Sequence, residues 1–508
     1  MRRFLVLLLC MCLLCGCASD PGAYIPTGDA LSGGDATGPQ TKPEPEAKPQ
    51  KMSLPYYREL SLNPYLCTDF TNRALLPLLY QSLFTVNRAY QAEPQLCKSY
   101  TVSKSMTSYT FYMEQATFSD GALLTAEDVA ASLKAAWQSQ FYKGRFLHVT
   151  GISETEDGGV TVTLDTPYEN LPLLLDVPII KASQVEQDRP LGTGPYRLYT
   201  AFGLESLKRR TDWWCRAKMA VTVDTINLFP AQSITNIRDQ FEFNGLSLAC
   251  ADPGSDRYAD YRCDYELWDC ENGIFLYLAT SEDSAVFSND KVRIALTHAV
   301  DRELLVKQYY RDFARGATLP ASPMSPYYDE NLAQRYGYDS GKFTKAVEDA
   351  ELQGSKIVFL VNSEDSLRVR AARQIAKMLE SSGLVVQMKE LRGDNYLQAL
   401  RYRSFDIYLG QTRLSANMDL SAFFHTYGAL SWGGVDDVSA YSLSLQALEN
   451  HGNYYTLHKR VMDNGLLCPV LFRSYAVYAA RGVVSDLTPA RDNIFYYSLG
   501  KTLEDAKQ

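Results

Sequence analysis

The sequence predicts an α/β fold, and three observations lead to this prediction. Between Gly354 and Gly410 the pattern runs strand, helix, strand, helix, strand, which is the signature of an α/β domain. Strong helix and strand signals also occur far outside this segment. The chain has 508 residues, of which 46% are apolar, and this length is sufficient for two or three domains with buried cores.

The clearest helix signal is the segment 125–137, TAEDVAASLKAAW. Thr125 is suited to the N-cap position, and Asp128 three residues later completes a capping box. Apolar residues then recur on one helical face at Val129, Leu133, Ala136 and Trp137. The segments 288–300 and 366–383 follow the same logic. Strand-like runs lie at 159–165, 355–362, 384–391 and 405–410.

The first residues predict a lipoprotein signal. Two arginines precede the apolar run FLVLLLCMCLL, which is too short to span a bilayer, and small residues follow. The sequence LLCGCAS resembles the bacterial lipobox, in which a cysteine is lipidated and becomes the first mature residue. Cys17 fits this role best, with Cys15 as the alternative, so we predict a signal peptide and lipidated cysteine over 1–17. An ordinary cleaved signal is the competing interpretation.

Residues 18–52 are rich in Gly, Pro, Ser and charge, and we expect them to form a disordered tether because they cannot bury a core. Seven of the 11 cysteines remain in the rest of the chain, an odd and scattered set that does not resemble a disulfide framework. A pair between Cys263 and Cys270 stays open. No CxxC spacing supports a zinc or redox site.

The sequence lacks the motifs that are typical of several classes of protein. The net charge of −9 argues against nucleic-acid binding, which needs clustered Lys and Arg. None of the five histidines forms HExxH, no GxSxG elbow exists, and no phosphate-binding GxxxxGK[ST] motif appears. The segment GTGPYR begins like a dinucleotide fingerprint, but Arg197 stands where the third Gly belongs. We therefore predict a protein that is not an enzyme and has no cofactor or metal; a hydrolase is the remote alternative.

Five stretches, in this order along the chain, resemble the extracellular solute-binding proteins of family 5, which are the oligopeptide-, dipeptide- and nickel-binding subunits of ABC importers. They are SLNPYLCTDFTNRALLPLLYQSL (61–83), YTFYMEQATFSDGALLTAEDVAASLKAAW (109–137), LGTGPYRLY (191–199) with DWW (212–214), NDKVRIALTHAVDRELLV (289–306) and CPVLFRSYAVYAARGVV (468–484). Each match is modest alone, and together they cover nearly all of residues 53–500.

The resemblance implies a periplasmic-binding-protein-like fold of type II, with two lobes joined by a hinge and an extra inserted domain. Lobe one is expected at 53–80, 186–270 and 470–508, the inserted domain at 81–185, and lobe two at 271–469. In this family the solute lies in the cleft, and the lobes close around it. The expected partners are an ABC permease and an ATPase as separate chains, because nothing here binds ATP.

The family's peptide-binding members place a carboxylate that pairs with the peptide amine in a segment similar to residues 410–424, GQTRLSANMDLSAFF. In the best alignment with this family segment, Ala416 stands at the position of the amine-binding carboxylate, and Asp419 stands at the position of the acid that follows it. Asp419 is therefore a candidate partner for the peptide amine only if the alignment is shifted by one to three residues. The alternative is that Asp419 caps a short helix. Arg413 is the second candidate, for an acidic group of the ligand. Trp432 is a third candidate, as a cleft aromatic, with plain packing as its alternative.

We expect a monomeric receptor that a lipid anchors at the extracellular face of the cell membrane, or on the periplasmic side in a cell with two membranes. It would capture a peptide or similar small solute and deliver it to an ABC importer. Three alternatives remain: a receptor of the same fold for nickel chelate or another non-peptide solute, a surface sensory or interaction protein without transport, and a surface hydrolase.

Overall fold

The computed structural model describes residues 52–217, 223–253, 261–426, 428–433, 437–483, 487–491 and 493–495. All of them belong to one compact unit, Lys48–Gln508. The predicted signal peptide (1–17), with Cys17, and all of the tether except Met52 lie outside the described residues. Among the helices of the described ranges, none is long and apolar enough to cross a membrane.

A four-stranded sheet carries the N-terminal strand. Its order is β1 (Met52–Tyr56), β12 (Thr225–Pro230), β11 (Leu204–Arg209) and β10 (Tyr196–Ala201). Strand β1 runs parallel to β12, and the other neighbours are antiparallel. The turn before β10 is the GTGPY motif, and the Gly194 N–H donates to the Leu79 carbonyl at 2.9 Å. The motif therefore ties this sheet to the segment that precedes residue 80.

A second four-stranded sheet is antiparallel throughout, in the order β5 (Cys97–Val102), β6 (Ser108–Met113), β8 (Val160–Leu164) and β7 (Val149–Glu154). Helix α3 (Ala126–Gln138) contacts β7. The capping box predicted for this helix is confirmed, because the Asp128 N–H donates to the Thr125 hydroxyl and the Thr125 N–H donates to the Asp128 carboxylate. The apolar face predicted for α3 is buried at Val129, Leu133 and Ala136.

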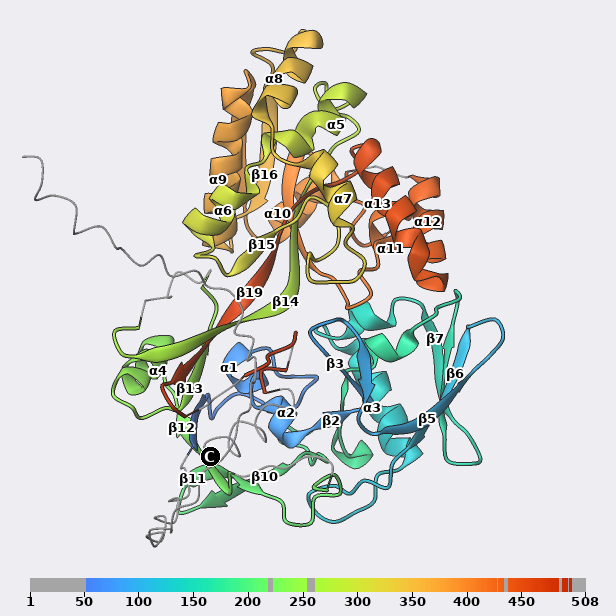
Figure 1. The fold of residues 1–508 in the computed structure, drawn as a ribbon, viewed down its shortest axis with the longest axis vertical. Helices are drawn as coiled ribbons and strands as arrows, with labels where there is room; N and C mark the ends of the chain where they lie inside the picture. Colours follow the sequence, from blue (N-terminus) through green and yellow to red (C-terminus); the bar gives the residue numbers. More distant parts are fainter. Residues whose placement is uncertain are drawn as a thin grey trace, which may run out of the picture. The chain divides into compact units, whose positions relative to one another are not determined.

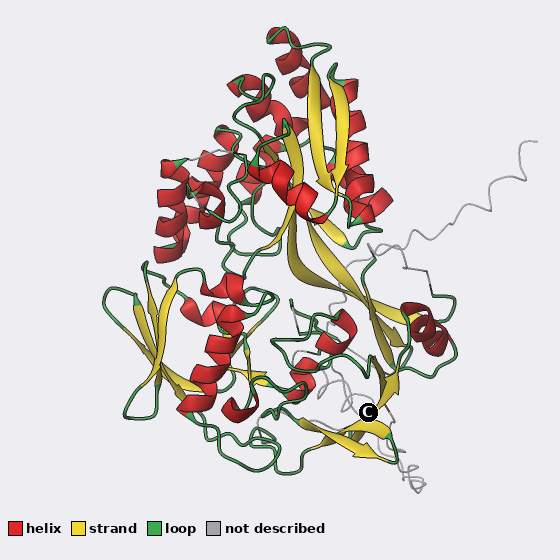
Figure 2. Cartoon of the chain, turned by 180° about the vertical axis from the view of Figure 1, so that it is seen from behind, coloured by secondary structure: helices red, strands yellow, loops and turns green. Residues whose placement is uncertain are grey.

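The largest sheet has seven strands. They follow the order β13 (Leu248–Ala251), β19 (Cys468–Ala480), β14 (Tyr265–Thr280), β18 (Ile407–Arg413), β16 (Lys356–Asn362) and β17 (Val385–Leu391), and β15 (Ala314–Gly316) pairs with β19. Strand β16 is parallel to β17 and β18, and helices α9 (Ser366–Ser381) and α10 (Gly393–Arg401) connect these strands. The predicted alternation between Gly354 and Gly410 is confirmed. Figure 2 shows helices on both sides of these strands.

The long strands β14 and β19 pair with each other from Tyr265↔Ala480 to Leu278↔Cys468. Figure 1 shows them running side by side from the part that holds α4 (Ile234–Glu242) to the part that holds α8 (Ser340–Asp349) and α9. Cys270 and Val477 belong to the hydrophobic core around β1 and α3, whereas Leu276 and Leu471 belong to the core beneath α9. The two strands thus link separate cores.

The remaining elements are mostly short. They are α1 (Phe70–Arg73), α2 (Leu76–Leu79), β2 (Gln81–Ser82), β3 (Phe84–Val86), β4 (Ala92–Pro94), β9 (Pro178–Ile179), α5 (Asp290–Ala299), α6 (Arg302–Tyr309), α7 (Glu330–Ala333), α11 (Ser421–Phe424), α12 (Val438–Glu449) and α13 (Tyr454–Asp463), with 3₁₀ turns η1 (Lys143–Phe146), η2 (Leu171–Leu174), η3 (Ala182–Gln184), η4 (Gln334–Tyr336) and η5 (His451–Asn453). The boundaries predicted for two lobes and an inserted domain stay a prediction.

The close approach at Gly194 gives a first test. A Cβ at this position would lie 2.5 Å from the Leu79 carbonyl carbon and 2.6 Å from the Leu78 carbonyl oxygen, and the backbone cannot yield as a side chain would. We expect Gly194→Ala to lower the free energy of unfolding by about 2 kcal/mol, measured by urea denaturation. Gly341→Ala, in exposed helix α8 with the nearest atom at 3.4 Å, is the control and should leave stability equal or higher. Equal stability of both variants would contradict this account.

Candidate functional site: an arginine-lined cavity

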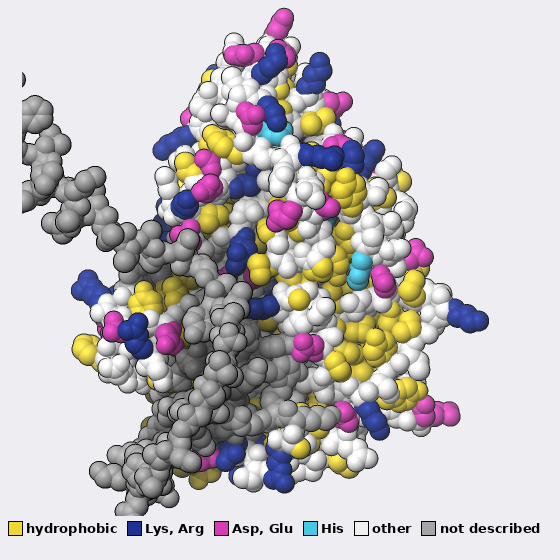
Figure 3. Space-filling model, viewed as in Figure 1, with side chains coloured by type: hydrophobic (Ala, Val, Ile, Leu, Met, Phe, Trp, Pro, Cys, Tyr) yellow, Lys and Arg dark blue, Asp and Glu magenta, His cyan; other side chains and the backbone are white. Residues whose placement is uncertain are grey.

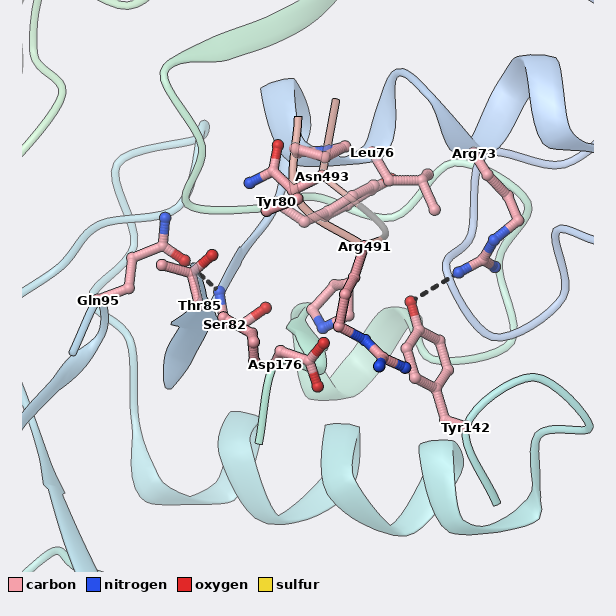
Figure 4. Close-up of a pocket in the computed structure, with 14 residues that line it drawn as sticks. Arg73, Leu76, Tyr80, Ser82, Thr85, Gln95, Tyr142, Asp176, Arg491 and Asn493 are labelled. Atoms are coloured by element: carbon pink, nitrogen blue, oxygen red, sulfur yellow. Dashed lines mark hydrogen bonds between the residues drawn. The ribbon is translucent and has the colours of Figure 1, made fainter. Parts of the chain in front are cut away.

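A cavity of about 60 Å³ lies where segments far apart in the sequence meet. Figure 4 shows it with the α1–α2 segment, strands β2 and β3, Gln95 and the segment after β19 contributing side chains. Its lining is Arg73, Leu76, Pro77, Tyr80, Ser82, Thr85, Val86, Gln95, Tyr142, Asp176, Pro178, Ala490, Arg491 and Asn493. The charged residues of this lining are Arg73, Asp176 and Arg491.

Arg73 is positioned by the short helix α1. The Asp69 side chain caps this helix by accepting from the Asn72 N–H. The Arg73 guanidinium donates to the carbonyls of Pro64 and Cys67 at 3.2 and 3.0 Å, and to the Tyr142 hydroxyl at 2.9 Å. These hydrogen bonds hold the Arg73 side chain in place. Because all three partners are neutral, none of them balances the positive charge of the guanidinium.

Arg145 lies behind the cavity wall and has a carboxylate partner. Its Nε and Nη2 donate to the two oxygens of Asp176 at 2.7 and 2.8 Å, and the side chains are 7% and 12% exposed. This bidentate geometry is the strong form of an arginine–carboxylate pair. The charge of Asp176 is therefore already balanced within the protein.

Arg491 follows β19 and has a left-handed backbone conformation with φ of 43°. Its carbonyl accepts from the Cys270 thiol at 3.0 Å. The residue is only 6% exposed, and Nη2 donates to the Leu414 carbonyl at 3.0 Å. Nε and Nη1 are buried and have no hydrogen-bond partner among the described residues. In Figure 4 the side chain points into the cavity.

Gly273 makes room for this guanidinium. The residue has φ of +71°, and a Cβ there would lie 2.8 Å from Arg491 Nη2 and 3.0 Å from the Leu414 carbonyl oxygen. A side chain at this point of β14 would displace Arg491, which explains why the strand carries a glycine in a position that otherwise weakens it.

Of the residues predicted from the sequence, Arg413 lies closest to this arrangement. It ends strand β18, and its guanidinium carbon is 4.2 Å from the centre of the Phe141 ring. Arg73 contacts the same ring, with its guanidinium carbon 3.1 Å from the centre. Arg413 is half-buried and is not part of the cavity lining given above.

Asp419 contacts a histidine. His148 Nε2 lies 3.2 Å from Asp419 Oδ2 and 3.2 Å from the Ser421 hydroxyl, and His148 Nδ1 lies 3.0 Å from Asp165. Asp419 Oδ1 accepts from the Ser421 N–H at 2.8 Å. The alternative that Asp419 is the N-cap is wrong in detail, because α11 begins at Ser421 and Leu420 holds the N-cap position. The carboxylate still accepts from the first helical N–H.

Trp432 is half-buried and packs against the core that contains Tyr277 and Phe423. The carbonyl of the next residue, Gly433, accepts from the Glu282 N–H at 3.0 Å. These contacts agree with the packing alternative for Trp432. Its role in the cleft stays a prediction.

Two further concavities lie near the first one. A cavity of about 60 Å³ shares Ala490 and Arg491 with it and also contains Glu271, whose carboxylate accepts from the Tyr90 and Ser322 hydroxyls. A more open groove of about 830 Å³ is lined by aromatic, proline and polar side chains from 84–100, 170–172 and 326–327 and by His451. Figure 3 shows hydrophobic side chains gathered over β3, β5 and β6 on this face.

The described residues bear on the expectations for disulfides and metal ligands. The seven described cysteines are free thiols, so the open possibility of a Cys263–Cys270 disulfide is wrong. Within the same ranges, no group of three or more His, Cys, Asp or Glu side chains is arranged to hold a metal ion.

Sequence reasoning missed Arg73 and Arg491. One usable signal was the position of Arg73 in TNRALLPLLY, where a charged residue directly precedes a largely apolar helix. Arg491 gave no comparable signal, because its burial depends on β14 and on the segment 487–495. Contacts between residues that lie hundreds of positions apart cannot be predicted from the spacing of residues along the sequence.

The His148 contacts give a test by pH. Burial lowers the pKa of His148, but the Asp419 and Asp165 carboxylates outweigh this effect and raise it above the ordinary value. A raised pKa in the folded state adds stability that is complete below about pH 6.5 and is lost as the pH rises through the folded pKa. We expect the stability advantage of wild type over His148→Gln, measured by urea denaturation, to shrink as the pH rises above about 6.5.

His298 is the matched control for this test. Burial lowers the pKa of His298, although its Nδ1 lies 2.6 Å from the Gly337 carbonyl. The pH dependence of His298→Gln relative to wild type should therefore run in the opposite direction. A pH-independent difference for His148→Gln would contradict the proposed ion pairs.

The chain matches a protein-family model and several known proteins. The model described as "Bacterial extracellular solute-binding proteins, family 5 Middle" matches residues 91–434, which is well over half of the chain. The glutathione-binding protein GsiB of Salmonella typhi is 26% identical over 306 residues, covering 57% of this chain and 59% of that protein. The chain thus spans about three fifths of the length of the curated relatives it matches.

Solved structures share the fold. The crystal structure of NikA from Brucella suis in complex with Fe(III)-EDTA has a TM-score of 0.70 at 18% identity, covering 88% of this chain and 99% of that one. A putative peptide binding protein AppA from Clostridium difficile has a TM-score of 0.72 at 14% identity, covering 89% and 99%. They confirm the predicted α/β fold of the type II periplasmic-binding-protein kind. The chain belongs to the bacterial extracellular solute-binding proteins of family 5.

Proposed function

We propose that this protein is a lipid-anchored extracellular receptor that captures a peptide or similar small solute and delivers it to an ABC importer. The family consists of solute-binding proteins and not of enzymes, in agreement with the sequence prediction. The observation that carries the proposal is the cavity at Arg73, Tyr142 and Arg491, because it offers the charged end group of a small solute a concave site with fixed polar groups. The permease and the ATPase would be separate chains.

Peptides are the solute class we favour. Curated relatives that match 57% of the chain are named for binding glutathione, itself a small peptide, and a structural neighbour is described as a putative peptide binding protein. Other neighbours are described in complex with Fe(III)-EDTA and with Ni(L-His), so a chelate receptor of the same fold remains the second candidate.

We further propose that the cleft lies between two lobes, with lobe one at 53–80, 186–270 and 470–508, lobe two at 271–469, and an inserted domain at 81–185. The residues that would hold the solute include Arg413, which shares the Phe141 ring with Arg73, and Asp419 and Trp432 from the neighbouring segment. Asp419 already contacts His148, so an amine would compete with that histidine.

Bound solute can be detected directly. We expect native mass spectrometry of the purified full-length chain to show a co-purifying small molecule, and isothermal titration calorimetry of stripped protein to detect glutathione or a tripeptide. Arg413→Ala should weaken that binding roughly tenfold. Arg401→Ala, exposed in helix α10, is the control. Absence of any bound solute together with absence of any heat of binding would contradict the receptor proposal.

The lipid anchor has its own test. We expect Cys17→Ser, expressed with its native signal in a bacterium, to move the protein from the membrane fraction to the soluble fraction and to abolish labelling by radioactive palmitate. Several acyl chains anchor a protein stably, whereas the bare chain has no comparable membrane affinity. Cys15→Ser should remain lipidated and membrane-bound. Loss of labelling in Cys15→Ser but not in Cys17→Ser would move the lipidated position to Cys15.

A further inference from the structure

The residues that line the cavity carry two positive charges, Arg73 and Arg491, and one negative charge, Asp176. Three arginines surround the cavity: the Arg145 side chain is 7% exposed, and Arg73 and Arg491 are 9% and 6% exposed. Asp176 is the single acid among the residues that line the cavity, and Arg145 occupies both of its oxygens. Among the described residues, neither Arg73 nor Arg491 forms an ion pair with a carboxylate.

Structural arginines in the same protein look different. Arg302 is also 6% exposed, and all of its side-chain nitrogens donate to oxygens of the Thr297, Val300, Ala317 and Pro469 residues. Arg491 donates only through Nη2 and leaves both Nε and Nη1 without an acceptor. Across the described chain, other buried arginines that lack an acceptor lack it at Nε alone.

An arginine held in this way costs folding free energy. Burying a charge without a partner is expensive, and so is leaving buried donors unsatisfied. Gly273 and the Cys270 thiol nevertheless fix Arg491 in place, with its guanidinium directed into the cavity. A fixed guanidinium with open donors matches the geometry that carboxylates require.

We infer that the solute of this receptor carries a carboxylate that pairs with the Arg491 guanidinium, with Arg73 as the second positive charge of the same cavity. The inference rests on the proposed function and specifies its substrate class: small solutes with a free carboxylate, such as peptides with an unblocked carboxyl group. Tyr142, which accepts from Arg73, would border the same site.

The test compares acids with their neutral derivatives on the full-length, solute-stripped protein. The probes are glutathione and its diester, and a tripeptide mixture with free or amidated carboxyl ends, each titrated by calorimetry. We expect the free acids to bind wild type roughly 10- to 100-fold more tightly than the blocked forms. In Arg491→Met this preference should disappear, and Arg491→Lys should restore part of it because it restores the charge.

Thermal unfolding of the solute-free protein separates a binding role from a structural one. Arg491→Met should unfold at the same or a higher temperature than wild type, because it removes an unpaired buried charge. The matched control is Arg145→Met, which breaks a bidentate pair, leaves Asp176 buried and should unfold several degrees lower.

The outcomes distinguish the inference from the proposed function. Equal binding of free and blocked probes, or an acid preference that survives in Arg491→Met, overturns the inference and leaves the receptor proposal standing. A marked loss of stability in solute-free Arg491→Met also overturns it, because Arg491 would then be structural. Failure of every probe to bind wild type contradicts both the inference and the peptide form of the proposed function.

Discussion

The pairing of β14 with β19 is the constraint on which the rest of the structure depends. Backbone hydrogen bonds along two long antiparallel strands hold together residues that lie some two hundred positions apart in the sequence. Each strand contributes apolar side chains to more than one hydrophobic core. The same pairing brings the segment after β19 next to β14, where the Cys270 thiol donates to the Arg491 carbonyl and Gly273 leaves space for the guanidinium. The pairing thus helps to position Arg491 at the wall of the cavity.

The buried arginines of the described residues differ in how completely the protein satisfies their donors. Arg302 satisfies its donors with backbone carbonyls, and Arg473 pairs with Asp252 and Asp365, so both contribute to the folded state without outside help. Arg491, which lines the cavity, instead leaves Nε and Nη1 without an acceptor. Such departures from polar satisfaction occur most often at functional sites, and the proposed carboxylate of the solute would supply the acceptor that Arg491 lacks.

Much of the fold was predictable because its signals are local. The capping box of α3 and the alternation of strands and helices between Gly354 and Gly410 depend on residues a few positions apart, and both are confirmed. The candidate site was predicted less well. The segment 410–424 contains Arg413, which contacts the same Phe141 ring as Arg73, and its role in binding stays a prediction. The contact of Asp419 with His148 joins positions 271 residues apart. The spacing of residues along the sequence does not predict such a contact.

The sequence by itself determined the α/β class, the order of the main helices and strands, and the family to which the chain belongs, because periodicity, caps and turn motifs act over short distances. Only the tertiary structure decided which charges are balanced. Arg73, Arg145 and Arg491 are the same residue type in the sequence. In the structure, Arg145 has a carboxylate within hydrogen-bond distance, whereas Arg491 has two nitrogens without an acceptor. Charge balance in a buried site depends on which distant segments meet there, and strand pairing across the whole chain sets those meetings.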